Sequence, residues 1–267
     1  MRDVVIVKLG GSLITDKGRL ASLRVDVLRR LCGEISEALG LMPEALLVAH
    51  GSGSFGHRAA EVHGLSAGAR ATTAGIAETQ AQARRLHELV LAALREAGVE
   101  CFSFVPGSAM VMDEAVEVSL HSEPLRLALE LGLVPVSFGD VVLDRSRGAS
   151  ICSTEVLLSA VVASLSQQPF RVQRILWLGD TDGVYDEAGE TIPEISRENS
   201  AAVLARVGEA AGTDVTGGMR LRIETGLQLA VEGVTSHLVN GLETGLLRRA
   251  LLNEETSGTR IAAIRSD

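Results

Sequence analysis

Short runs of consecutive apolar residues, rich in Val, Ile and Leu, recur along this chain and alternate with longer segments of helical periodicity. Strands are predicted at residues 4–9, 45–50, 99–105, 134–138, 174–178 and 234–239. Helices are predicted at residues 24–39, 74–97, 124–131, 154–166, 200–207, 219–231 and 242–252. Strands that are apolar throughout and separated by helices form a parallel sheet covered on both faces. We therefore expect an α/β fold, a three-layer αβα sandwich around a mainly parallel sheet, with one hairpin at residues 143–153.

A glycine-rich turn follows the first predicted strand. Lys8 ends that strand, Gly10-Gly11-Ser12 come directly after it, and Lys17 lies in the same loop. Ligands of such sheets bind beyond the carboxyl ends of the strands, and glycine lets backbone N–H groups approach an anion. A lysine beside the turn can neutralise a phosphoryl group in transfer. Taken alone, the turn fits a tight strand-to-helix connection with solvated lysines equally well.

A second glycine-rich turn follows the second predicted strand and runs from His50 to His57. Gly51, Gly53 and Gly56 alternate there with serines. A turn of this composition offers several N–H donors, and a histidine at its end can donate to a phosphate. A single histidine at a strand end is more often structural, but two such turns after buried strands favour a phosphate site.

Two further turns carry polar residues. Residues 179–186, Gly-Asp-Thr-Asp-Gly-Val-Tyr-Asp, are rich in acids but lack the spacing of a calcium-binding EF-hand loop. Residues 214–222 place Thr-Gly-Gly at the start of a predicted helix, where free N–H groups favour an anion, and Arg222 lies one turn further on.

Composition and missing motifs exclude several classes of protein. The formal charge of −9 argues against a general nucleic-acid binder, and no apolar run approaches the length of a membrane span. Three widely spaced cysteines suggest neither a zinc site nor a disulfide framework. Neither glycine-rich turn matches the GxxxxGK[ST] loop, and no GxGxxG follows the first strand with an acidic residue at the expected distance, which excludes the ordinary nucleoside-triphosphatase and dinucleotide-binding classes. We expect a cytoplasmic protein.

Taken together, the four turns resemble the amino acid kinase superfamily, and most closely its isopentenyl phosphate kinase branch. The resemblance covers nearly the whole chain: KLGGSLITDK at residues 8–17, HGSGSFGH at 50–57, FGDVVLD at 138–144, DVTGG at 214–218 and the closing GTRI at 258–261. KLGGS alone is typical of the superfamily. The histidine that ends the second turn narrows the choice to the branch.

The resemblance implies transfer of the γ-phosphate of ATP to isopentenyl phosphate, with Mg²⁺ entering on ATP, few direct protein ligands for it, and a homodimer. It implies catalytic roles for Lys8, Lys17 and His57. The acceptor would be bound by Gly51, Gly56, His57 and Ser153. ATP would be bound by Lys8, Gly10, Gly11, Ser12, Ser52, Asp180, Tyr185, Gly218 and Arg222. Residues 1–168 would form the acceptor half and residues 169–267 the ATP half, with a soft boundary at a polar break.

The chain departs from the branch at three positions. Arg222 stands where a lysine is usual, Glu155 where an aspartate is usual, and Gly179 where a threonine is usual. Arginine and lysine are not equivalent at a phosphate. We hypothesise that the first two changes compensate, with Glu155 pairing with Lys8 or Arg222.

Two competing functions remain open from the sequence. One is a related kinase for another small phosphate or phosphonate, such as a fosfomycin kinase; the other is a non-catalytic nucleotide-binding regulator. The tail of the acceptor distinguishes an isopentenyl phosphate kinase from a kinase for a small polar phosphonate, because an isoprenoid tail needs an apolar pocket. Residues 74–94 are expected to form a wall of that pocket, but they mix Ala and Leu with Thr79, Gln80 and Arg84.

Overall fold

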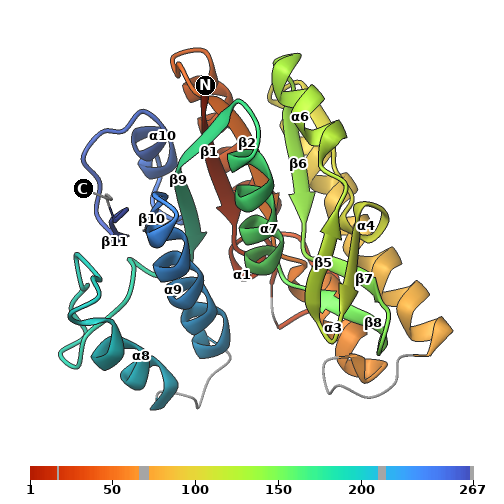
Figure 1. Cartoon of the computed structure of the whole chain (residues 1–267). Helices are drawn as coiled ribbons and strands as arrows, with labels where there is room; N and C mark the ends of the chain where they lie inside the picture. Colours follow the sequence, from red (N-terminus) through yellow and green to blue (C-terminus); the bar gives the residue numbers. More distant parts are fainter. Residues whose placement is uncertain (17, 66–71, 210–214, 265–267) are drawn as a thin grey trace.

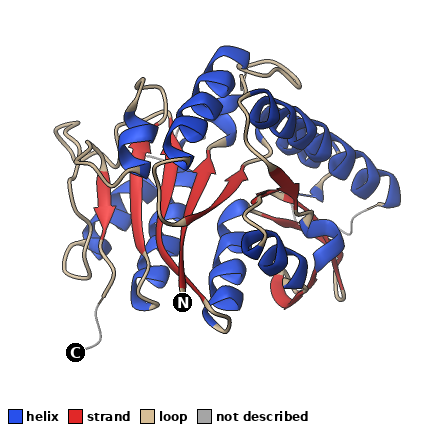
Figure 2. Ribbon diagram, turned by 90° about the horizontal axis from the view of Figure 1, so that it is seen from above, coloured by secondary structure: helices blue, strands red, loops and turns tan. Residues whose placement is uncertain are grey.

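The computed structural model describes residues 1–16, 18–65, 72–209 and 215–264, and its centre is a seven-stranded sheet (Figures 1 and 2). The order of the strands is β11-β10-β9-β1-β2-β6-β3. Their bounds are β1 Arg2–Leu9, β2 Ala45–His50, β3 Cys101–Ser103, β6 Val134–Phe138, β9 Phe170–Gly179, β10 Thr235–Asn240 and β11 Thr259–Ile261. Only β11 pairs antiparallel in this sheet as described, so the predicted mainly parallel sheet is confirmed.

The middle segments of the central strands are apolar because both faces of the sheet are covered. In β1, Val4 and Ile6 pack into one hydrophobic cluster, whereas Val5 and Val7 pack into another. All four side chains are fully buried. Since successive side chains of a strand point to opposite faces, a strand with two buried faces is apolar through its centre, and its polar residues, such as Lys8, lie towards its ends.

Helices form a layer on each face of the sheet. One layer contains α1 Gly11–Ile14, α2 Val25–Leu39, α3 Gly53–Val62, α4 Thr73–Glu96 and α10 Leu246–Leu251. The other contains α6 Glu123–Glu130, α7 Thr154–Ser166 and α9 Val215–Val231, with α8 Ser200–Glu209 packed on α9 (Figure 1). In the part of the chain that the structure describes, none of these helices is both long and apolar enough to cross a membrane.

A smaller four-stranded sheet lies beside α4 and α6 (Figure 1). Its order is β5-β4-β7-β8, with β4 Met110–Asp113, β5 Val116–Leu120, β7 Asp140–Asp144 and β8 Gly148–Cys152; α5 Pro106–Ala109 precedes it. The β7–β8 pair confirms the predicted hairpin. The β4–β5 hairpin was not predicted, because its two strands are short and β5 is mostly exposed or half-buried.

Candidate active site

A cavity of about 740 Å³ opens beyond the carboxyl ends of the central strands. This is the edge of the sheet at which the sequence places its glycine-rich turns. Most of the predicted site residues line it: Lys8, Gly11, Ser12, Gly51, Ser52, Gly56, His57, Ser153, Asp180, Gly218 and Arg222. One cavity therefore brings together segments from both ends of the sequence.

Two predicted site residues that the structure describes, Gly10 and Tyr185, do not line this cavity. Gly10 lies beneath it, where an added β-carbon would meet the carbonyl oxygen of Leu178 at 2.7 Å. The Tyr185 hydroxyl accepts a hydrogen bond from the backbone of Asp182 in its own loop, at 3.0 Å. Lys17 lies outside the described residues.

The backbone ladder of the sheet continues one residue past the ends of the strands. The N–H of Gly10 donates to the carbonyl of Leu178, and the N–H of Gly51 donates to the carbonyl of Leu9. These bonds tie the ends of β9, β1 and β2 to one another. The floor of the cavity is therefore part of the sheet and is held at fixed spacing.

The two glycine-rich turns touch each other backbone to backbone. A β-carbon at Gly11 would lie 2.6 Å from the nitrogen of Gly53, and one at Gly51 would lie 2.9 Å from the nitrogen of Gly11. The buried hydroxyl of Thr15 joins the turns, since it donates to the carbonyl of Gly11 at 2.7 Å and accepts from the N–H of Ser54 at 3.0 Å. These glycines are thus required by close packing as well as by any ligand. Thr15 lies in the family-like segment at residues 8–17, but nothing in the sequence assigned it a role.

The second turn is shorter than the sequence predicts. Helix α3 begins at Gly53, whose φ of +50° is a conformation that glycine adopts without strain. Gly56 and His57 therefore lie on a helix and not in a loop. His57 is exposed on α3 and lines the cavity, so the helix fixes the direction in which its imidazole enters. The prediction of a continuous turn from His50 to His57 was wrong because a glycine-rich segment conceals helical structure.

Three charged side chains meet at the inner end of the cavity. The Nζ of Lys8 donates to Oε1 of Glu155 at 2.8 Å, and Nε of Arg222 lies 3.6 Å from the same oxygen. Their side chains are only 5%, 7% and 13% exposed, in the order Lys8, Glu155, Arg222. The hypothesis that Glu155 pairs with Lys8 or Arg222 is confirmed, and it pairs with both.

Burial and charge set the protonation of this cluster. Burial and the neighbouring Arg222 lower the pKa of Lys8 to about 8, against the opposing effect of Glu155. Burial acts to raise the pKa of Glu155, but the charges of Lys8 and Arg222 outweigh it and lower that pKa. The cluster is therefore one carboxylate between two cations. At neutral pH it carries a net charge of +1 in a buried position, which favours an anionic ligand.

The start of helix α7 positions Glu155 and forms one wall of the cavity. The Ser153 hydroxyl caps the helix by accepting from the N–H of Val156 at 3.2 Å. The Thr154 hydroxyl donates to the carbonyl of His50 at 3.0 Å, which ties the helix to the end of β2. Glu155 lies in the first turn, where the helix dipole favours a carboxylate. The sequence analysis selected Ser153 and Glu155 but missed Thr154.

Away from the charged cluster, at what we call the outer end, one wall of the cavity is apolar, although Arg58 and Glu61 of α3 also line the cavity. Ala60 of α3, Val141 of β7 and Ile151 of β8 line it and belong to one small hydrophobic cluster. Thr79 and Ala83 of α4 complete this wall, as expected for the segment at residues 74–94.

Two polar groups interrupt the apolar end. The buried hydroxyl of Thr79 has no hydrogen-bond partner among the described residues. The carboxylate of Asp140 accepts from the N–H groups of Gly107 and Val141, and burial raises its pKa to about 6. Neither residue was selected from the sequence as a site residue. Thr79 gives no signal of its own, because it lies in an ordinary helical pattern.

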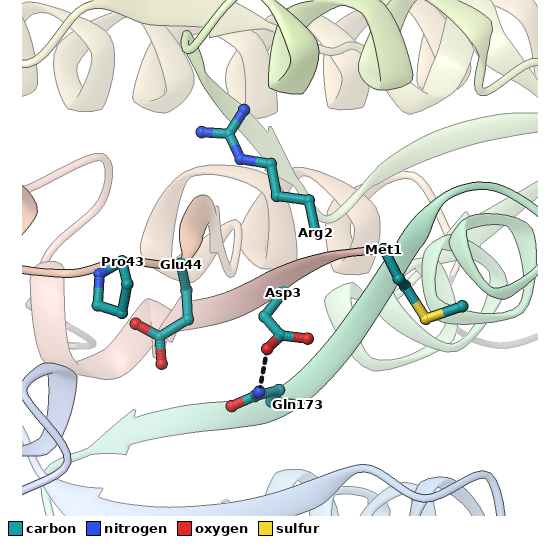
Figure 3. A pocket seen from close by; sticks show the side chains of 6 residues that line it. All are labelled: Met1, Arg2, Asp3, Pro43, Glu44 and Gln173. Carbon is teal, nitrogen blue, oxygen red and sulfur yellow. Dashed lines mark hydrogen bonds between the residues drawn. The ribbon is translucent and has the colours of Figure 1, made fainter.

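A second cavity, of about 470 Å³, lies at the opposite edge of the sheet near the start of β1 (Figure 3). The carboxylate of Asp3 accepts hydrogen bonds from Arg171 and Gln173, and the carboxylate of Glu44 accepts one from Arg174. Because its acids are already paired, this cavity offers a ligand far less than the larger one does. Its wall is formed by Met1, Arg2, Asp3, Pro43, Glu44 and Gln173.

Within the described ranges, no group of three His, Cys, Asp or Glu side chains has an arrangement that could hold a metal ion by itself. Asp180 is the carboxylate of the acid-rich turn that faces the larger cavity. Hard cations such as Mg²⁺ bind through one or two carboxylates together with the phosphates of a nucleotide, and this cavity can supply such a carboxylate.

Comparison with known proteins gives a consistent result. The model of the amino acid kinase family matches residues 3–240. The isopentenyl phosphate kinase of Methanothermobacter thermautotrophicus is 36% identical over 272 residues, covering 97% of this chain and 98% of the relative. That of Methanocaldococcus jannaschii is 28% identical, with 97% and 98% covered. A crystal structure of an isopentenyl phosphate kinase superposes with a TM-score of 0.79 at 30% identity, over 97% of this chain and all of the other.

Proposed function

Because this chain belongs to the amino acid kinase family, we propose that it is a kinase that transfers the γ-phosphoryl group of ATP to isopentenyl phosphate. The products are isopentenyl diphosphate and ADP. One observation carries the proposal: a single cavity joins the buried cationic cluster of Lys8, Glu155 and Arg222 to an apolar end. An acceptor with a phosphate and a short hydrocarbon tail matches both ends.

The acceptor phosphate lies between the two ends of the cavity in this proposal. The imidazole of His57 donates a hydrogen bond to this phosphate, and backbone N–H groups near Gly51 and Gly56 hold it in line. Ser153 also lines the cavity. The tail points towards Ala60, Val141 and Ile151. A phosphate acceptor is already ionised at neutral pH, so the reaction requires no general base.

The donor lies at the inner end. An oxygen of the acceptor phosphate forms a bond to the γ-phosphorus while the bond from that phosphorus to the β-phosphate oxygen breaks. Lys8, Lys17 and Arg222 stabilise the charge on the phosphoryl group during this exchange. The remaining groups of the ATP site are Gly10, Gly11, Ser12, Ser52, Asp180, Tyr185 and Gly218. Mg²⁺ entering with ATP would neutralise part of the charge of the phosphates, and Asp180 is the carboxylate that could help to hold it.

The proposal divides the chain into an acceptor half, residues 1–168, and an ATP half, residues 169–267. The boundary falls between α7 and β9, and the seven-stranded sheet continues across it. We further propose a cytoplasmic homodimer, by the family resemblance. Size-exclusion chromatography with light scattering tests the dimer.

The decisive experiment supplies the purified protein with ATP, Mg²⁺ and a panel of acceptors and measures ADP. We expect turnover on isopentenyl phosphate, accompanied by isopentenyl diphosphate in the product mixture. Glutamate, which offers a carboxylate, serves as the negative acceptor. Turnover on glutamate or fosfomycin with none on isopentenyl or dimethylallyl phosphate would contradict the proposal.

A small polar phosphonate is the second candidate acceptor. The hydroxyl of Thr79 and the carboxylate of Asp140 favour it, because a purely hydrocarbon tail leaves both without a new partner. Thr79→Val separates the candidates. It should leave turnover of isopentenyl phosphate intact but weaken a polar acceptor that hydrogen-bonds to this hydroxyl.

A further inference from the structure

The guanidinium of Arg222 lies against backbone that carries no side chain. Arg222 extends from α9 towards the ends of β9 and β1. A β-carbon built at Gly179 would lie 3.1 Å from Nη1 of Arg222, and one built at Gly10 would lie 3.5 Å from Nη2. The first distance is shorter than ordinary van der Waals contact, so a side chain at position 179 would require the guanidinium to shift by at least a few tenths of an ångström.

Among the described residues, no group fully satisfies the hydrogen-bonding capacity of the same arginine. Its Nε is buried and makes no hydrogen bond among the described residues, and the Glu155 oxygen 3.6 Å away is already bonded to Lys8. A buried cation that shares one carboxylate with a second cation keeps unsatisfied charge and donors. Both cations line the cavity, where an anion can satisfy them.

We propose that Gly179 and Arg222 form a matched pair, in which the missing side chain at position 179 lets the Arg222 guanidinium lie beside Glu155 and bind the phosphates of the donor. Gly179 is thus a positioning residue that acts through Arg222. The inference rests on the proposed function for the identity of the donor. A lysine at position 222 would need less room, because its single ammonium is narrower than a planar guanidinium.

A double-mutant cycle tests the pair through turnover. Gly179→Thr should lower kcat about 100-fold when Arg222 is present, because the threonine displaces the guanidinium. In the Arg222→Lys background the same change should cost less than about threefold, so the double variant is more active than Gly179→Thr alone. If the two single losses simply multiply in the double variant, the pair does not exist.

A second readout requires no substrate. The chain contains two lysines, Lys8 and Lys17, so protein labelled with isotopes in its lysine side chains gives two signals by nuclear magnetic resonance. A Lys17→Arg variant assigns them. Because Arg222 lowers the pKa of Lys8, displacement of the guanidinium in Gly179→Thr should raise the titration midpoint of Lys8 from about 8. An unchanged midpoint would contradict the displacement.

The matched control is Gly40→Thr. Gly40 ends α2 with an ordinary φ of −72°, and nothing lies within 4 Å of an added β-carbon. It should change neither kcat nor the Lys8 midpoint, and thermal unfolding of all variants identifies any that fail to fold. Absence of turnover on isopentenyl phosphate in the unmodified protein would contradict the proposed function but leave the lysine titration valid. Normal turnover with no coupling and no shift would overturn the pair alone.

Discussion

The inner and outer ends of the cavity are built in different ways. At the inner end, three buried charged side chains and two glycine-rich turns contact one another within a few ångströms. At the outer end, apolar side chains from α3, α4, β7 and β8 form a wall interrupted by Thr79 and Asp140. Charge and backbone packing leave the inner end little freedom, whereas hydrophobic contact is non-directional and tolerates changes of size. We therefore expect the chemistry to depend on the inner end and the choice of acceptor on the outer end.

Lys8→Met removes the cation of the inner end without changing its volume much. We expect kcat to fall about 10³-fold, because in the proposed reaction the charge on the transferring phosphoryl group loses one of the two buried cations of the cluster. Glu155 keeps Arg222 as a partner, so the protein should still fold. Steady-state kinetics with both substrates varied measures the effect. Arg171→Met, at an exposed ion pair with Asp3, is the control and should leave kcat unchanged.

His57→Ala acts at the junction between the two ends. We expect kcat/KM for the acceptor to fall about 10²-fold while KM for ATP stays the same, since the lost donor contacts the acceptor phosphate only. Initial rates at saturating ATP, followed by binding of ATP alone, separate the two effects. Equal losses of kcat/KM for the acceptor and for ATP would contradict the division of the cavity into a donor end and an acceptor end.

Ile151→Ala enlarges the outer end. The space left by the isoleucine should lower the KM of acceptors with longer hydrocarbon tails by roughly 3–10-fold. It should raise the KM of isopentenyl phosphate by a similar factor. KM for ATP should not move. Leu143→Ala, on the exposed face of the neighbouring strand, is the matched control. A change in kcat with no change in acceptor preference would place Ile151 outside the acceptor site.

Substitution of the two buried histidines behind the second turn, His50 and His87, is expected to have the smallest effect on turnover. Nε2 of His50 lies 3.1 Å from Nδ1 of His87, and burial lowers their pKa values to about 4 and about 3, against an ordinary value of 6.5. Since both bases are neutral when folded, the unfolded chain takes up protons first as the pH falls. Stability is therefore complete above pH 6.5 and is lost towards pH 4, by up to about 1.4 kcal/mol per pH unit for each histidine.

His87→Asn should reduce this loss, because it removes one titrating group but keeps a donor towards His50. Urea unfolding at pH 7.5, 6 and 5 measures the slope of stability against pH. His121→Asn, at an exposed position, should retain the full slope. An identical slope in both variants would show that other groups govern the acid sensitivity.

Much of the inner end could be predicted from the sequence. The turns after the strands at residues 4–9 and 45–50 carry local glycine patterns, and parallel strands deliver their carboxyl ends to one edge. Lys8 and Arg222 were selected beside glycine-rich turns, whereas Glu155 was noticed only as a departure from the pattern of the family. The outer end was less predictable. Ala83 and Ile151 look like any core residue in a helix or a strand, and only the packing of α4 beside the β7–β8 hairpin makes them part of a pocket.

The sequence by itself determined the parallel sheet, the order of its main elements and the end of the strands at which the candidate site lies, because these follow from local apolar patterns and from the rules of strand connection. Only the tertiary structure decided that α3 begins inside the second turn. It alone brought Gly11 into contact with Gly53, and Arg222 into contact with Gly179, which are 42 and 43 residues apart in the sequence. The reason is physical: contacts between backbone and guanidinium depend on distances of a few tenths of an ångström, which residue spacing does not encode.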